Sequence, residues 1–117
     1  MINNALGTTE AALYHYTTEG AAKSIAKTGL NLSSDGFVYS TPKAGLSPIQ
    51  AQIELSLSPN RGLPNATFKF DLKGLNKAGI IPTLGPRNVT GGSFGAGGGT
   101  EVLFNKPIPP QYLIRIK

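Results

Sequence analysis

The chain has 117 residues, 39% of them hydrophobic, and its eleven basic residues against six acidic ones give a formal net charge of +5. This length suits one domain with a single core, and the hydrophobic content argues against disorder. The absence of cysteine excludes a disulfide framework and suits a reducing compartment. The positive charge favours anionic partners in general, but the basic residues are scattered, so we expect no direct binding of nucleic acid.

The termini and the hydropathy bear on domain boundaries and on membrane binding. No apolar run approaches the roughly 20 residues that span a bilayer, and the N-terminus lacks the charged and apolar regions of a signal peptide. We therefore expect no membrane partner. Residues 1–10 are interpreted as a loose leader and residues 11–117 as a single domain.

Two helices are predicted, both in the first half of the chain. The first has Thr17 or Thr18 as its N-cap and ends at Gly29, because Ser and Thr favour helix starts and Gly favours helix ends. The second begins at Ser47, followed directly by a proline, and ends by Ser58 before another proline.

Short segments rich in β-branched and aromatic residues predict strands. These segments are residues 11–16, 30–32, 37–39, 66–72, 79–81, 100–104 and 112–116. Lys69 alternates with Phe68 and Phe70, so we expect it to face solvent. The segment 83–99 is interpreted as a long structureless loop with a functional role. We expect its glycine-rich part, residues 85–99, to be mobile until a target or an inhibitor binds.

Several chemistries are excluded by the spacing of their residues. One histidine, no cysteine and dispersed acids match no zinc or calcium motif, so we expect no metal site. Residues 91–95 match the G-x-S-x-G pattern of serine hydrolases, but the histidine lies upstream and no helix can follow the glycines. Residues 95–100 lack the last glycine of the dinucleotide-binding loop and lead into a strand.

Three side chains that can take part in catalysis or ligand binding remain: His15 on the first strand, Tyr39, and Glu101 after the glycines. Cleavage of the bond between nicotinamide and ribose passes through an oxocarbenium-like state, which a carboxylate such as Glu101 can stabilise. A tyrosine can stack on the nicotinamide ring, and a histidine can hold a ribose hydroxyl. Each residue also has a purely structural interpretation, as a hydrogen-bonded core histidine, a packed aromatic ring and a solvated strand end.

Four segments in order resemble the His-Tyr-Glu branch of the mono-ADP-ribosyltransferase toxins: Leu13–Thr17, Thr28–Leu30, Asp35–Thr41 and Gly97–Glu101. The last segment and the following Lys106–Tyr112 are similar to the C-terminal toxin domains of bacterial Rhs-repeat polymorphic toxins. That group includes domains that modify elongation factor Tu. The order and spacing of the segments carry the resemblance.

The resemblance covers residues 11–117 and implies an α+β fold, a split β-sandwich of two small antiparallel sheets with about two flanking helices. It implies an antibacterial toxin that transfers ADP-ribose from its substrate NAD to a bacterial protein such as elongation factor Tu, and so blocks translation. It also implies secretion by the producing bacterium as part of a larger effector, action in the cytoplasm of the target cell, and a cognate immunity protein.

The same resemblance implies the roles of particular residues. Glu101 is the catalytic residue, His15 contacts the adenosine-side ribose, Tyr39 stacks against nicotinamide, and the segment before Glu101 meets the target protein. The full set implied to bind NAD is His15, Tyr16, Thr17, Tyr39 and Ser40.

Two positions depart from the family pattern. Gly99, two residues before Glu101, stands where the arginine-modifying branch has Glu or Gln, and the predicted helix 47–58 lacks the family's second tyrosine. Two other functions remain open. One is a ribonuclease toxin in which the basic charge binds phosphates and His15 and Glu101 form the acid and base pair, and the other is a non-catalytic module that binds a cognate protein.

Overall fold

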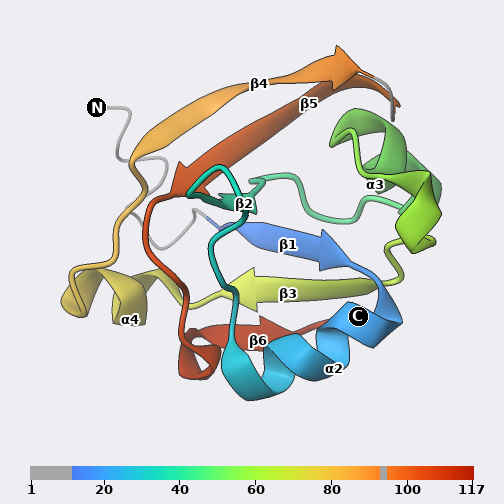
Figure 1. The fold of residues 1–117 in the computed structure, drawn as a ribbon. Coiled ribbons are helices and arrows are strands. Elements are labelled where there is room, and N and C mark those ends of the chain that lie inside the picture. The colour runs from blue at the N-terminus through green and yellow to red at the C-terminus, as the bar shows by residue number, and fades with distance from the viewer. Residues whose placement is uncertain (1–11, 93–94) are drawn as a thin grey trace.

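The computed structural model describes residues 12–92 and 95–117, which form two antiparallel sheets of three strands each with three α-helices around them (Figure 1). The expected α+β class with two small sheets is confirmed, with three α-helices in the described residues in place of two. The expected leader, residues 1–10, lies outside the described residues. The elements in chain order are β1 (Tyr14–Thr17), α2 (Glu19–Thr28), β2 (Val38–Ser40), α3 (Pro48–Glu54), the 3-10 turn η1 (Pro59–Arg61), β3 (Ala66–Phe70), α4 (Leu72–Lys77), β4 (Leu84–Gly92), β5 (Gly95–Phe104), the 3-10 turn η2 (Pro110–Tyr112) and β6 (Leu113–Arg115).

The two sheets have the strand orders β1-β3-β6 and β2-β5-β4. They meet at one point, where Tyr14 and Thr41 exchange two backbone hydrogen bonds of 2.8 and 2.9 Å. Beyond that bridge β1 pairs with β3, and β2 pairs with β5, so the two sheets separate (Figure 1). The space beside the bridge is therefore bordered by strands of both sheets.

The main hydrophobic core joins the two sheets. Phe70 of β3 and Phe104 of β5 stack with their ring centroids 5.5 Å apart, and both rings are almost completely buried. Stacked aromatic pairs add about 0.5–1.5 kcal/mol to the free energy of burial. Helix α2 covers this core with Ala22 and Ile25. The core thus fixes β5, the strand that carries Glu101, relative to the sheet that carries His15.

Both predicted helices are confirmed with their caps. The Thr18 hydroxyl accepts the amide of Ala21 at the start of α2, and Ser47 forms a reciprocal capping box at the start of α3. Gly29 ends α2 at a φ of +77°, and a Cβ there would collide with the backbone carbonyl of Ile108. A glycine is therefore needed at this position for both its conformation and its close approach.

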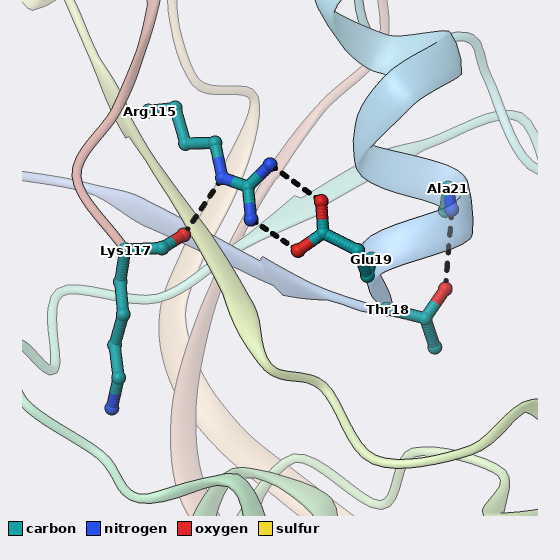
Figure 2. A network of polar contacts seen from close by, with 5 residues as sticks. All are labelled: Thr18, Glu19, Ala21, Arg115 and Lys117. Atoms are coloured by element: carbon teal, nitrogen blue, oxygen red, sulfur yellow. Dashed lines mark hydrogen bonds and ion pairs between the residues drawn. The ribbon is translucent and has the colours of Figure 1, made fainter.

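The C-terminal strand is tied to the start of α2 by an ion pair. Figure 2 shows Arg115 of β6 donating through both terminal nitrogens to the carboxylate of Glu19. Its Nε donates to the backbone carbonyl of Lys117 at 2.9 Å. The hydrogen bonds from Arg115 lower the pKa of Glu19 below its ordinary value. Glu19 also lies in the first turn of α2, where a negative charge is favourable.

The third helix, α4, was not predicted. The alternation of Phe68, Phe70 and Leu72 indicated a strand to residue 72, but β3 ends at Phe70 and Leu72 begins α4. Asp71 caps this helix by accepting the amide of Gly74 at 3.1 Å. Lys69 is exposed on β3, as expected. An N-cap aspartate thus overrides the local strand pattern.

The prediction of a structureless loop over residues 83–99 is wrong for residues 84–92 and 95–99, which lie in β4 and β5, and residues 93 and 94 of this loop lie outside the described residues. Strand β4 pairs with β5, with Arg87 opposite Glu101 and Asn88 opposite Thr100. The register shifts twice, and Gly85 and Gly98 lie at these irregularities with φ near +94°. Glycines that indicated a loop supply the conformations that bulges require. Glu101 consequently lies on a paired strand.

Two further strand predictions are wrong. Residues 79–81 form no strand, and within 30–32 only Leu30 pairs, through an isolated bridge to Ile108. None of the helices in the described ranges has the length and apolar character required to cross a bilayer.

Candidate active site

A cleft opens beside the bridge between the two sheets, with a cavity volume of about 90 Å³. Its walls come from β1, β2, β4, β5 and the segment after α3. The lining residues are Tyr14, His15, Tyr16, Tyr39, Ser40, Thr41, Leu55, Leu57, Val89 and Glu101. The cleft therefore combines aromatic rings and apolar walls with one carboxylate.

Five of the six predicted site residues line this cleft, although they come from three separate segments of the chain. The exception is Thr17, which ends β1 and pairs with Ala66 of β3. The structure thus brings together His15, Tyr16, Tyr39, Ser40 and Glu101, and leaves Thr17 outside. Their roles toward NAD remain predictions.

His15 stands at the point where the sheets separate. Its Nδ1 lies 2.9 Å from the carbonyl oxygen of Tyr39, and because a carbonyl only accepts, Nδ1 carries the proton. Burial lowers the pKa of His15 below 6.5, although the hydrogen bond to Tyr39 opposes this shift. The ring is therefore neutral at pH 7, and its Nε2 is a hydrogen-bond acceptor.

The phenol hydroxyl of Tyr39 is bound by a residue that does not line the cleft. Its hydroxyl donates to the carboxylate of Asp35, which also accepts the hydroxyl of Ser33. The bond to Asp35, with burial as a second cause, raises the pKa of Tyr39 to about 12. Tyr39 is therefore a neutral ring with a fixed orientation on one wall of the cleft.

The hydroxyls of Tyr16 and Ser40 are engaged in the fold. Tyr16 donates to the carbonyl of Lys43 at 2.6 Å and accepts the amide of Leu46, and its burial raises its pKa. Ser40 donates to the carbonyl of Val102 at 2.8 Å, which joins β2 to β5. Both residues are almost fully buried. Their hydroxyl protons are thus used in hydrogen bonds to the backbone that hold the walls of the cleft in place.

Glu101 is held by an arginine that the sequence analysis missed. Its Oε2 accepts the Nε–H of Arg87 at 2.7 Å, across the β4–β5 pairing in which the two residues are direct partners. The Glu101 side chain is 15% exposed and that of Arg87 is 48% exposed. The cross-strand ion pair fixes the orientation of the carboxylate at the edge of the cleft. Only the register of the hairpin identifies Arg87, so no short motif marks it.

The apolar wall of the cleft was also missed in part. Leu57 was assigned to the second helix, but α3 ends at Glu54 and Ser56 adopts a φ of 54°. This turn redirects the chain so that Leu55 and Leu57 line the cleft, opposite strand residues such as Val89. The signal in the sequence was the pair of leucines at spacing two, which does not fit a helix face.

The structure gives a physical reason for the departure at Gly99. A Cβ at this position would lie 2.9 Å from the carbonyl oxygen of Glu54 and 3.2 Å from a methyl group of Leu55. Helix α3 therefore packs directly on the backbone of β5 here. A glutamate or glutamine at position 99 would have no space in this fold without a shift of α3.

Chemically, the cleft offers an oriented carboxylate, a neutral histidine acceptor, a fixed aromatic ring and an apolar wall. This set can bind an aromatic group and hydroxyl groups and can stabilise a developing positive charge. Among residues 12–92 and 95–117, no cluster of three or more histidines and acids is placed to hold a metal ion. Comparisons with protein-family models, with curated proteins and with solved structures found no match for this chain.

Proposed function

We propose that this chain is an NAD-dependent mono-ADP-ribosyltransferase that modifies a bacterial protein. One observation carries the proposal: His15, Tyr39 and Glu101, chosen from distant segments for their chemistry, line one cleft between the two sheets. A structural role for each residue separately does not require that they converge. The resemblance to the His-Tyr-Glu toxins adds the identity of the reaction.

Each residue has a part in the proposed reaction. The carboxylate of Glu101 stabilises the positive charge that develops on ribose as nicotinamide leaves. Tyr39, a neutral ring with its hydroxyl engaged by Asp35, presents its face to the nicotinamide. The Nε2 of His15 accepts a hydrogen bond from a ribose hydroxyl, because its Nδ1 is engaged by the carbonyl of Tyr39.

The size of the cleft supports binding of one end of a larger molecule. Its volume of about 90 Å³ is well below the roughly 300–1,000 Å³ of sites that enclose a whole drug-sized ligand. A dinucleotide would place its nicotinamide end in the cleft and the remainder outside it. The apolar side chains of Leu55, Leu57 and Val89 suit the ring and exclude water from it.

We place this activity in competition between bacteria. By the resemblance, the domain is the toxin part of a larger secreted effector, acts in the cytoplasm of the target cell and is neutralised by a cognate immunity protein. Elongation factor Tu is the proposed target, and its modification would block translation.

The test is incubation of the purified chain with labelled NAD and either bacterial lysate or purified elongation factor Tu. We expect label on a protein, with transfer unaffected by a metal chelator because the site needs no metal. Label on elongation factor Tu identifies the target, and label on another protein retains the reaction but corrects the target. Absence of both labelled protein and released nicotinamide would refute the proposal.

A ribonuclease is the second candidate, and the state of His15 favours it. A neutral histidine with an accepting Nε2 is the form that a general base requires. The reaction also needs a proton donor, and Glu101 in its ion pair with Arg87 is an acceptor. We therefore rank this function second. Degraded RNA without labelled protein in the same lysate would reverse the ranking.

A further inference from the structure

Arg87 has unused hydrogen-bonding capacity beside the cleft. An arginine carries five N–H donors in a planar fork. Arg87 uses its Nε–H for Glu101, and its two terminal nitrogens have no hydrogen-bond partner among the described residues. By contrast, Arg115 engages both terminal nitrogens with Glu19. About half of the Arg87 side chain is exposed to solvent.

The charges around the cleft single out this arginine. Of the ten lining residues, Glu101 is the acid, and none carries a positive charge at pH 7, since burial keeps His15 neutral. Arg87 contacts a lining residue directly and carries a permanent positive charge. Arg87 is therefore a cation in direct contact with the lining of the cleft, available to an anionic group that remains outside the small cavity.

The geometry of the fork indicates which anion fits. Terminal guanidinium nitrogens bind two oxygens of one phosphate at once, and such charge-assisted bonds are among the strongest in proteins. The Nε bond to Glu101 fixes the plane of the guanidinium and so reduces the freedom lost on binding. The β4–β5 pairing, in which the two residues are opposite partners, holds this arrangement in place.

We propose that Arg87 binds a phosphate group of the nucleotide substrate through its terminal nitrogens while its Nε keeps Glu101 in position. This inference rests on the proposed function and specifies how the site selects a phosphorylated nucleoside over the bare nucleoside. Arg87 is thus a binding and positioning residue, and it couples the capture of substrate to the orientation of the carboxylate.

The test compares two probes that differ in one phosphate: nicotinamide mononucleotide and nicotinamide riboside. Calorimetry on the wild type should show binding of the mononucleotide at least about tenfold tighter, as expected for charge-assisted hydrogen bonds. Arg87→Met should abolish this difference between the two probes, so that the mononucleotide binds no more tightly than the riboside. Arg87→Lys should restore part of it, because lysine keeps the charge but lacks the fork.

Arg61→Met is the matched control. It removes the same charge from an exposed arginine in η1 that does not line the cleft, so the preference for the mononucleotide should persist. A second measurement uses the wild type only and thus does not depend on folding of a variant. The NMR signals of the Arg87 guanidinium should shift on titration with the mononucleotide and stay in place with the riboside.

The outcomes separate this inference from the proposed function. If both probes bind the wild type equally, the role of Arg87 is refuted while the nicotinamide site stands. If the mononucleotide is preferred equally by the wild type and by a folded Arg87→Met, another group binds the phosphate and the inference is wrong. If neither probe binds although the chain releases nicotinamide from NAD, the inference is wrong and the proposed function stands. If release of nicotinamide is absent as well, the proposed function fails too.

Discussion

Replacement of Glu101 by glutamine separates the proposed catalytic role of this residue from its structural role. Glutamine keeps the shape and an oxygen that can accept the Nε–H of Arg87, but it lacks the negative charge. Loss of a group that stabilises transition-state charge costs about 10²–10³ in rate, or about 2.7–4 kcal/mol. We expect Glu101→Gln to reduce transfer from NAD by at least about 100-fold.

The cost in stability should be far smaller than the cost in rate. The Arg87 side chain is 48% exposed, and ion pairs of this kind contribute about 0–1 kcal/mol. A protein stabilised by about 5 kcal/mol or more stays more than about 99% folded after such a loss. Partial unfolding therefore cannot account for a 100-fold loss of activity.

The assay pairs nicotinamide release and protein labelling with thermal unfolding of the same sample. Glu54→Gln is the matched control, because it removes one carboxylate charge from the end of α3, outside the cleft lining. It should keep activity within a few-fold of wild type. Near wild-type transfer by a folded Glu101→Gln would refute the catalytic assignment, and an equal loss in both variants would show that net charge alone matters.

Three further predictions concern packing and protonation. Gly99→Ala places a methyl group 2.9 Å from a backbone carbonyl oxygen of α3 and should lower the free energy of unfolding by about 1–3 kcal/mol. Its matched control is Gly20→Ala in α2, whose new methyl group has no atom within 4 Å apart from its own helix backbone and chain neighbours, and which should raise this free energy by up to about 1 kcal/mol. Asp35→Asn removes the negative charge of the acceptor that raises the pKa of Tyr39 to about 12, so this pKa should fall toward 10.0 in an absorbance titration of the phenolate. The pKa of Glu19 is lowered in the native state, so its contribution to stability is present above the ordinary pKa of 4.5 and is lost as the pH falls through the lowered value. The wild type should thus lose more stability on acidification than Glu19→Gln.

Each of these predictions has a contradicting result. Equal urea midpoints for Gly99→Ala and the wild type would show that α3 moves freely away from β5. An unchanged Tyr39 titration in Asp35→Asn, with Tyr39→Phe used to identify the signal, would exclude the charged carboxylate of Asp35 as the cause of the shift. Parallel acid unfolding curves for the wild type and Glu19→Gln would mean that the ion pair to β6 contributes no stability.

Helices α2 and α3 were predictable from sequence because their signals are local. Thr18 and Ser47 cap amides only three residues away, and Gly29 meets the conformational requirement at the end of α2. These interactions form within one helical turn and so leave a pattern in adjacent residues. The short helix α4 has the same kind of cap, Asp71, but it follows an alternating apolar run that continues into its first residue, Leu72.

The β4–β5 pairing was not predictable because its glycines are compatible with two different structures, a loop and a pair of bulged strands. A glycine with positive φ is typical of a loop and equally typical of a bulge between paired strands. Gly85 and Gly98 are of the second kind, as only their position opposite a partner strand reveals. The register of that pairing is a property of two segments together, and no single segment encodes it.

The sequence by itself determined which side chains are candidates for a chemical role. His15, Tyr39 and Glu101 stand out because the chain has one histidine, no cysteine and few acids, so few combinations were available. Only the tertiary structure decided what surrounds them. The bulged pairing of β4 and β5 brings Arg87 into an ion pair with Glu101. The bridge between the sheets brings the Nδ1 of His15 within hydrogen-bonding distance of the carbonyl of Tyr39. Such contacts depend on strand register and on the way two sheets separate, which are set by packing of the whole core.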